Sequence, residues 1–257
     1  MVRMEHMHKT YNPGSVHEKA MFQDFGLEIR KGDFVSVVGS NGSGKTTLLN
    51  LLCGSLPLDA GSIRLGERRI DSLPEFQRSR FIGRVFQDPA KGTCAELTIL
   101  ENMALADNKG KCYGLTRGVN RSRAEAYRQM LMELGLGLEN SLDQRVGSLS
   151  GGQRQALALL IATMTPIELL ILDEHTAALD PKSSEMVMWL TDRIVRERKL
   201  TTLMVTHNLK YAIQYGNRIV MMHQGGVVLD AADDEKQKRS VEDLLKIFTE
   251  ISVELGN

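Results

Sequence analysis

The sequence predicts an α/β protein with a mostly parallel sheet built around a phosphate-binding loop. Three observations favour this fold class. A glycine-rich stretch, residues 39–47, lies between an apolar run at 34–38 and a helical pattern that begins near Thr46. Two later apolar runs, 169–172 and 202–205, alternate with helical patterns. Strands that are apolar along their whole length are typical of a parallel sheet covered on both faces.

Length, charge and composition limit the possible functions. The 257 residues are enough for one large domain or two small ones, and 32 basic residues balance 32 acidic ones. This neutral balance gives no basic surface for nucleic acid, so we expect no nucleic-acid partner. The uncharged run 156–167 contains Pro166 and, like every other uncharged run in the sequence, is shorter than the ~20 apolar residues of a membrane span.

The N-terminus and the cysteines indicate a reducing compartment. The first residues lack the apolar core of a signal peptide, so we expect the chain to stay in the cytosol. Cys53, Cys94 and Cys112 follow no metal-ligand spacing, and one would be left over in any disulfide scheme. We expect free thiols that are buried or partly buried.

In residues 1–86, turn residues and the spacing of apolar residues predict the strands and the helix. Residues 1–33 mix short apolar stretches with turns and predict antiparallel strands. Leucines in 47–52 continue the helix after the glycine-rich loop, and Gly54 ends it. Short strands are expected at 62–65 and 83–86.

The middle of the chain, residues 88–142, has a helical character. Apolar residues recur at helical spacing in 98–106 and 121–134, which predicts an inserted helical subdomain. The glycine-rich run 107–120 between them predicts a mobile loop.

From Gly151 the alternating pattern returns. It predicts helices through Met164, over 183–198 and from Asn208, and strands at 169–172, 202–205, 219–222 and 227–229. A final helix is expected over 241–255.

The glycine-rich loop fits the pattern G-x-x-x-x-G-K-[ST]. Glycines let backbone N–H groups turn toward a phosphate, the lysine reaches the terminal phosphates, and the threonine hydroxyl can bind Mg²⁺. The alternative is an ordinary glycine-rich turn before a lysine, which the flanking strand and helix argue against. The predicted nucleotide-binding residues of this loop are Gly39, Ser40, Asn41, Gly42, Ser43, Gly44, Lys45, Thr46 and Thr47.

Two further stretches narrow the chemistry. The apolar strand 169–172 ends in Asp173 and Glu174, as needed for one acid to hold Mg²⁺ through water and the next to polarise an attacking water. The alternative is a buried strand followed by ordinary surface acids. Residues 149–153 form a second glycine-rich helix start without a lysine, in which Ser150 can donate to a phosphate. We therefore expect the second loop to serve a nucleotide on another copy of the chain.

In this order, the motifs resemble those of the ATP-binding subunits of ABC transporters, over nearly the whole chain. The matching motifs are Walker A at 39–47, the Q-loop at Gln87, the signature Leu-Ser-Gly-Gly-Gln at 149–153, Walker B at 169–174, the D-loop at 178–180 and the switch histidine His207. The resemblance implies the ABC ATPase fold, as one domain over 1–257. Residues 1–86 and 160–257 would form the nucleotide-binding core with its antiparallel β subdomain, and 87–159 the helical subdomain.

The resemblance also implies site residues. Tyr11 would stack on adenine, although a tyrosine there has an ordinary surface or core role as its alternative. Gln87 would approach Mg²⁺ and the γ-phosphate, and His207 would contact the γ-phosphate. Catalysis is assigned to Glu174, with Gln87 and His207; metal binding to Thr46, Gln87 and Asp173; and nucleotide binding across the dimer to Ser150, Gly151, Gly152 and Gln153.

One position departs from the family. His175 stands where proline usually follows the catalytic glutamate. Proline would restrict the backbone of Glu174, whereas histidine frees it and adds a titratable ring beside the site. We interpret the change as a neutral variant. The histidine form resembles a subgroup of importer ATPases, some of them for aromatic amino acids.

The function implied is ATP hydrolysis at two composite sites in a head-to-tail homodimer, with ATP and Mg²⁺ bound. The subunit would lie on the cytoplasmic face of the membrane and drive a separate integral membrane permease. An extracytoplasmic solute-binding protein would complete a system for import of a small solute such as an amino acid. The alternatives are an exporter ATPase, a soluble ABC-type ATPase acting on ribosomes or DNA, and a nucleotide-gated clamp with negligible turnover.

Overall fold

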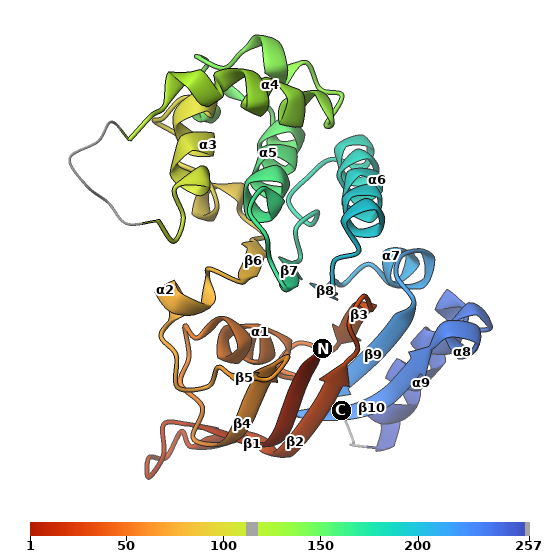
Figure 1. Ribbon diagram of the computed structural model, residues 1–257. Helices are drawn as coiled ribbons and strands as arrows, with labels where there is room; N and C mark the ends of the chain where they lie inside the picture. Colours follow the sequence, from red (N-terminus) through yellow and green to blue (C-terminus); the bar gives the residue numbers. More distant parts are fainter. Residues whose placement is uncertain (112–117, 255–257) are drawn as a thin grey trace. The chain divides into compact units, whose positions relative to one another are not determined.

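The computed structural model describes residues 1–111 and 118–254. The chain divides into two compact units, which are considered one at a time (Figure 1). The first unit comprises Met1–Ser79 and Arg198–Asn257, and the second comprises Arg80–Glu197. The subdomain boundaries expected at residues 87 and 159 stay a prediction.

An antiparallel sheet opens the first unit, in the order β2-β1-β4-β5. Its strands are β1 (Val2–Tyr11), β2 (Lys19–Ile29), β4 (Ala60–Leu65) and β5 (Arg68–Arg69). Buried and exposed side chains alternate along the start of β1, as expected for a strand with one covered face. The antiparallel strands predicted for residues 1–33 are confirmed.

A second set of strands in the first unit is mainly parallel, in the order β10-β9-β3-β8. It contains β3 (Phe34–Gly39), β8 (Thr202–Val205), β9 (Arg218–His223) and β10 (Gly226–Ala232). β3 is buried at every position and pairs in parallel with both β8 and β9, while β10 runs antiparallel to β9. The predicted parallel arrangement is therefore confirmed here.

Helix α1 (Lys45–Cys53) follows β3 and ends at Gly54, as the sequence predicts. The guanidinium of Arg78, at the end of α2 (Glu75–Arg78), closes the end of α1 by donating to the carbonyls of Leu51 at 2.6 Å and Leu52 at 3.1 Å. These bonds satisfy carbonyls that the end of a helix leaves without an intrahelical partner. Burial lowers the pKa of Arg78.

Three C-terminal helices complete the first unit: α7 (Leu209–Gln214), α8 (Asp233–Gln237) and α9 (Val241–Glu254). Leu244 of α9 and Ala212 of α7 join an apolar cluster with Val38, Ile219 and Met221 of the strands. The predicted C-terminal helix thus packs back on the sheet.

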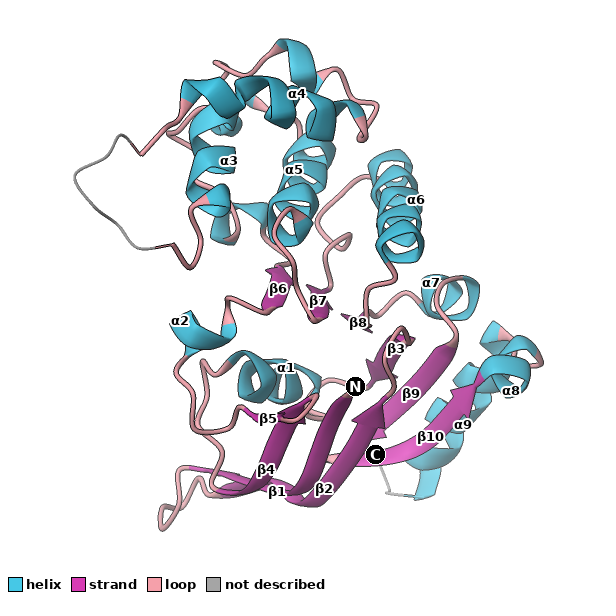
Figure 2. Ribbon diagram, viewed as in Figure 1, coloured by secondary structure: helices cyan, strands magenta, loops and turns pink. Residues whose placement is uncertain are grey.

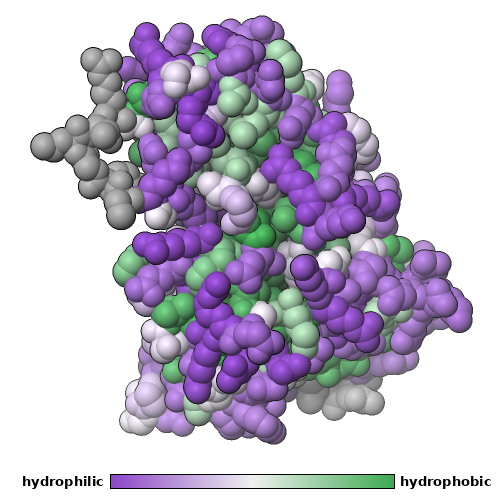
Figure 3. Space-filling model, in the orientation of Figure 1, coloured by the Kyte–Doolittle hydropathy of each residue, from purple (hydrophilic) through white to green (hydrophobic). Residues whose placement is uncertain are grey.

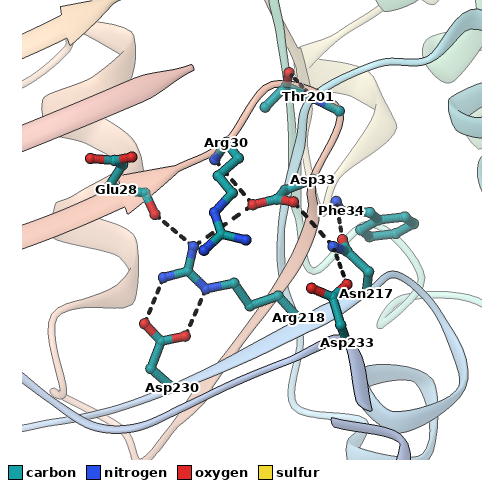
Figure 4. Close-up of polar contacts among 10 residues, drawn as sticks. Glu28, Arg30, Asp33, Phe34, Thr201, Asn217, Arg218, Asp230 and Asp233 are labelled. Carbon is teal, nitrogen blue, oxygen red and sulfur yellow. Dashed lines mark hydrogen bonds and ion pairs between the residues drawn. The ribbon is translucent and has the colours of Figure 1, made fainter. Parts of the chain in front are cut away.

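A polar network fixes the N-terminal ends of β3 and β9 in the first unit (Figure 4). Arg218 donates to both carboxylate oxygens of Asp230 at 2.6 Å and to the carbonyl of Glu28 at 2.6 Å. Asn217 accepts from the backbone N–H of Phe34 at 2.8 Å and donates to Asp33 at 3.0 Å. Because these bonds join residues distant in sequence, they set the starting register of β3, whose other end leads into the phosphate loop.

The second unit is mostly helical, as Figure 2 shows. Its helices are α3 (Ile99–Asp107), α4 (Ala124–Met132), α5 (Gly151–Thr163) and α6 (Pro181–Arg198). Two short strands, β6 (Ile82–Val85) and β7 (Leu169–Asp173), pair in parallel. Thr98 caps α3 by accepting from the N–H of Glu101, whose side chain accepts in return.

Part of the loop predicted at 107–120 lies outside the described residues, as does Cys112. Cys53 is buried and, among the described residues, forms no disulfide, as expected; Cys94 forms none either but is exposed, so the expectation of partial burial was wrong for this residue. Among the described residues, no helix combines the length and apolar character needed to cross a bilayer. Hydrophilic side chains cover most of the face shown in Figure 3.

Candidate functional site

The phosphate loop joins β3 to α1 in the first unit. Gly44 immediately precedes the helix with φ of 104°, and a Cβ built there would lie 2.9 Å from the ring of Phe22. Both the backbone angle and the close contact require glycine. No side chain caps the start of α1, and its first turn contains no acid. The helix therefore presents backbone N–H groups and a positive dipole end to an anion.

Lys45 is folded over this loop. Its ammonium donates to the carbonyls of Gly39 at 2.8 Å and Ser40 at 2.9 Å, and the residue is 6% exposed. Phosphate oxygens would offer charged acceptors in the same place, and charge-assisted bonds are stronger than bonds to neutral carbonyls. Asn41, Gly42 and Thr46 are exposed at the loop surface, whereas Ser43 and Thr47 are buried.

The parallel strands bring two histidines to the loop's edge of the sheet. Val37 of β3 is level with Val205 of β8, so Gly39 is level with His207, two residues farther along each strand. His207 is exposed there. Ligands of such sheets bind outside the carboxyl ends of the strands.

His223, at the end of β9, was not selected from the sequence. Its Nδ1 lies 3.3 Å from the hydroxyl of Ser40 in the phosphate loop. The backbone N–H of Gly225, in the turn after β9, donates to the carbonyl of Ser43 at 3.0 Å. No ligand-type spacing marks His223, and only its position at the end of a parallel strand could have indicated it.

Tyr11 lies at the end of β1, where its hydroxyl is 3.0 Å from the hydroxyl of Thr47. The residue is partly exposed. The first unit thus brings together Tyr11, the loop 39–47 and His207.

In the second unit, parallel pairing places Glu174 level with Gln87, and Asp173 one residue earlier. Val85 of β6 is opposite Leu172 of β7, so Gln87 and Glu174 follow the two strands at the same level. Gln87 is exposed, and Asp173 and Glu174 are partly buried. Arg84 of β6 donates to one oxygen of Asp173 at 2.7 Å.

Glu174 has a left-handed backbone, with φ of 47°. His175, which follows it, is 2% exposed, and its Nε2 lies 3.1 Å from the hydroxyl of Thr191 on α6. Because that hydroxyl already donates to the carbonyl of Val187, Nε2 carries the proton and donates to Thr191. Burial lowers the pKa of His175 to about 4, so the ring is neutral near pH 7. The His175 ring is thus anchored to α6, and the expected freedom of the Glu174 backbone stays a prediction.

The signature residues form the start of α5. The hydroxyl of Ser150 accepts from the N–H of Gln153 at 3.2 Å, and the side chain of Gln153 accepts from the N–H of Ser150 at 3.1 Å. A Cβ built on Gly152 would lie 3.0 Å from the side chain of Ser183, a tight contact that Ser183 would have to relieve. Gly151 lies close to Leu179 of the D-loop. Ser150 itself is exposed.

Magnesium is implied by the motifs, and the donor chemistry fits it. Thr46 and Asp173 supply a hydroxyl and a carboxylate, which are the hard oxygen ligands that Mg²⁺ takes. Among the described residues, no group of three or more histidines, cysteines and acids could hold a metal by itself.

The chain is similar to known proteins over most of its length. The family model described as ABC transporter matches residues 22–177. A tyrosine transport ATP-binding protein of Clostridioides difficile is 45% identical over 248 residues, which cover 96% of this chain and 98% of the relative. A thiamine import ATP-binding protein, ThiQ of Photobacterium profundum, is 30% identical, with 85% and 86% of the two chains covered.

The fold is also similar to that of a solved ATP-binding cassette. The dimeric ATP-binding cassette MJ0796, in a post-hydrolysis state bound to ADP and Pi, matches with a TM-score of 0.75 and 29% identity. The match covers 90% of this chain and 98% of that one.

Proposed function

This chain belongs to the ABC transporter family, as an ATP-binding subunit, and we propose that it drives import of a small solute such as an amino acid. It is an ATPase of that family. The observation that carries the substrate class is the 45% identity, over nearly the full length of both chains, to a protein named for tyrosine transport.

The hydrolytic step follows from the residue types at the two strand edges. Lys45 and the N–H groups at the start of α1 balance charge on the phosphates. Glu174 orients a water and accepts its proton while the water oxygen attacks the γ-phosphorus and the bond to the bridging oxygen of ADP breaks. Gln87 and His207 contact the γ-phosphate region. Thr46 and Asp173, with Gln87, would hold Mg²⁺, which offsets phosphate charge when it is bound.

Two copies of the chain would form two such sites, arranged head to tail. The chain has two glycine-rich helix starts, at Lys45 and at Ser150, but only the first carries a lysine. The phosphates bound at one copy's loop would receive Ser150, Gly151, Gly152 and Gln153 from the other copy. Association of the two copies is then favoured only while the γ-phosphate supplies these contacts. Hydrolysis removes the contacts and lets the copies separate.

The motion would be passed to a separate integral membrane permease. We place the subunit at the cytoplasmic face of the membrane, bound peripherally, with an extracytoplasmic solute-binding protein in the same system. The relatives named for tyrosine transport and thiamine import support this arrangement.

Reconstitution tests the proposal. The chain would be assembled in proteoliposomes with candidate permeases and candidate solute-binding proteins from the same genome, with ATP on the side of this chain. Labelled tyrosine should move toward the ATP side. Lys45→Ala should reduce this transport by about two orders of magnitude, because it removes the loop's cation. Movement away from the ATP side, or no ATP-dependent movement of any amino acid, would contradict the proposed import.

A further inference from the structure

Arg84 faces the carboxylate that ends the neighbouring strand. On the parallel pair of β6 and β7, Arg84 is opposite Ile171. Side chains two residues apart on a strand share a face, so Asp173 lies on the same face as Arg84, one step farther along. The Arg84 Nη2 to Asp173 Oδ2 distance is 2.7 Å, and the side chains are 13% and 17% exposed. The pair is therefore largely shielded from water.

The contact uses only part of the hydrogen-bonding capacity of the guanidinium and the carboxylate. Arg84 donates to one oxygen of Asp173, whereas an arginine and a carboxylate can form two parallel bonds. Among the described residues, the buried Nε of Arg84 has no hydrogen-bond partner. The guanidinium carbon instead lies 4.7 Å from the centre of the Phe86 ring. The guanidinium is thus held by packing and by one ionic contact, which a divalent cation is able to replace.

We propose that Arg84 is a built-in counter-ion for Asp173. It neutralises this carboxylate in the nucleotide-free chain, so that Asp173 takes Mg²⁺ only when the metal arrives with ATP. The proposal rests on the proposed function, in which Asp173 holds Mg²⁺. An ATP-bound metal carries phosphate oxygens as additional ligands, whereas free Mg²⁺ dehydrates reluctantly and is bound weakly by one carboxylate that already has a partner.

The nucleotide-free protein tests this without any activity measurement. Arg84→Met should lower Tm by about 5 °C or more, because it leaves Asp173 without its partner in a shielded site. Millimolar Mg²⁺ should recover at least about half of that loss, while wild type should respond little. Mn²⁺ titration followed by electron paramagnetic resonance should show a Kd at least about ten-fold lower in Arg84→Met than in wild type. Sodium chloride at equal ionic strength controls for screening.

Three further variants make the test specific. Arg84→Lys keeps a cation and should behave like wild type in its metal response. The double variant Arg84→Met with Asp173→Asn should lose the response to Mg²⁺. Arg128→Met removes an exposed arginine of α4 and should change neither measurement.

An Arg84→Met protein that binds Mn²⁺ no more tightly than wild type, or gains no stability from Mg²⁺, would overturn the counter-ion role. The proposed function is judged separately, by ATP-dependent transport in proteoliposomes, so either idea can fail without the other.

Discussion

At the scale of single residues, His175 shows how one buried ring supports the site. It follows Glu174 in sequence, and its imidazole donates to Thr191 on α6. Glu174 has a left-handed backbone, which is costly for a residue with a side chain. The contact with Thr191 holds the residue directly after Glu174 against α6.

The burial of His175 predicts a loss of stability in mild acid. Its pKa is about 4 in the folded chain and about 6.5 for an exposed histidine, so below pH 6.5 the unfolded chain binds a proton that the folded chain does not. The free energy of unfolding therefore has its full value, as far as His175 is concerned, above pH 6.5, and it decreases as pH falls toward 4. Between pH 7 and pH 5, the free energy of unfolding should fall by roughly 2 kcal/mol more in wild type than in His175→Gln.

Urea denaturation of both proteins at the two pH values measures this difference. His6→Gln serves as the control, because His6 is exposed and its pKa is raised by Asp24 rather than lowered. Equal pH dependence in wild type and His175→Gln would show that the ring is protonated as easily in the folded chain as in the unfolded one.

The chemistry of the motifs could be predicted from the sequence, but the environments of individual side chains could not. The spacing of Lys45 and Thr46 after glycines indicates phosphate chemistry wherever the loop lies. The environments of His175, Arg84 and His223 depend on which strand or helix packs beside them, and no pattern within a few residues encodes that. His175 was expected to be a titratable ring beside the site, yet packing against α6 makes it a buried neutral anchor.

At the scale of elements, helix α5 connects two of the predicted motifs. Gln155 lies two residues after the signature and is fully buried. Its side-chain amide donates to the carbonyl of Phe86 at 3.0 Å, and Phe86 directly precedes Gln87. A hydrogen bond within the second unit therefore joins the signature helix to the backbone directly before the Q-loop.

Gln155→Leu should weaken this connection. The carbonyl of Phe86 loses a buried donor, so we expect a loss of about 1–2 kcal/mol in the free energy of unfolding. The kcat for ATP hydrolysis should fall about ten-fold because Gln87 is less well placed, while the Kd for ATP stays within about two-fold. Gln129→Leu, at an exposed position of α4, is the matched control. A variant with wild-type kcat would show that the bond is structural only.

The long elements were predicted from their period, and the short ones were missed. α1, α5, α6 and α9 have sustained helical spacing, and β3, β7 and β8 are mostly apolar, so sequence and structure agree there. β5, α2 and α8 have two to five residues each, too few to show a period. They form because of tertiary contacts, such as the bonds from Arg78 of α2 to the end of α1.

At the scale of the whole molecule, the account depends on two copies sharing two nucleotides. Each copy would provide Lys45 at one site and Ser150 at the other. The family relationship extends over nearly the entire chain, and the similar cassette of known structure is described as a dimer. In the proposed dimer, the ATP phosphates would bind residues of both copies, and hydrolysis would remove those contacts and let the copies separate.

The most direct test is the mass of Glu174→Gln in solution. This variant should bind ATP with Mg²⁺ but hydrolyse it very slowly, because the group that accepts the proton from water is gone. Size-exclusion chromatography with light scattering should show a dimer with ATP and a monomer without it. Adding Ser150→Arg should abolish the dimer, whereas Ser148→Arg, at an exposed position two residues earlier, should leave it intact. If Glu174→Gln stays monomeric with saturating ATP and Mg²⁺, or if Ser150→Arg dimerises as well as its control, the shared-site account is contradicted.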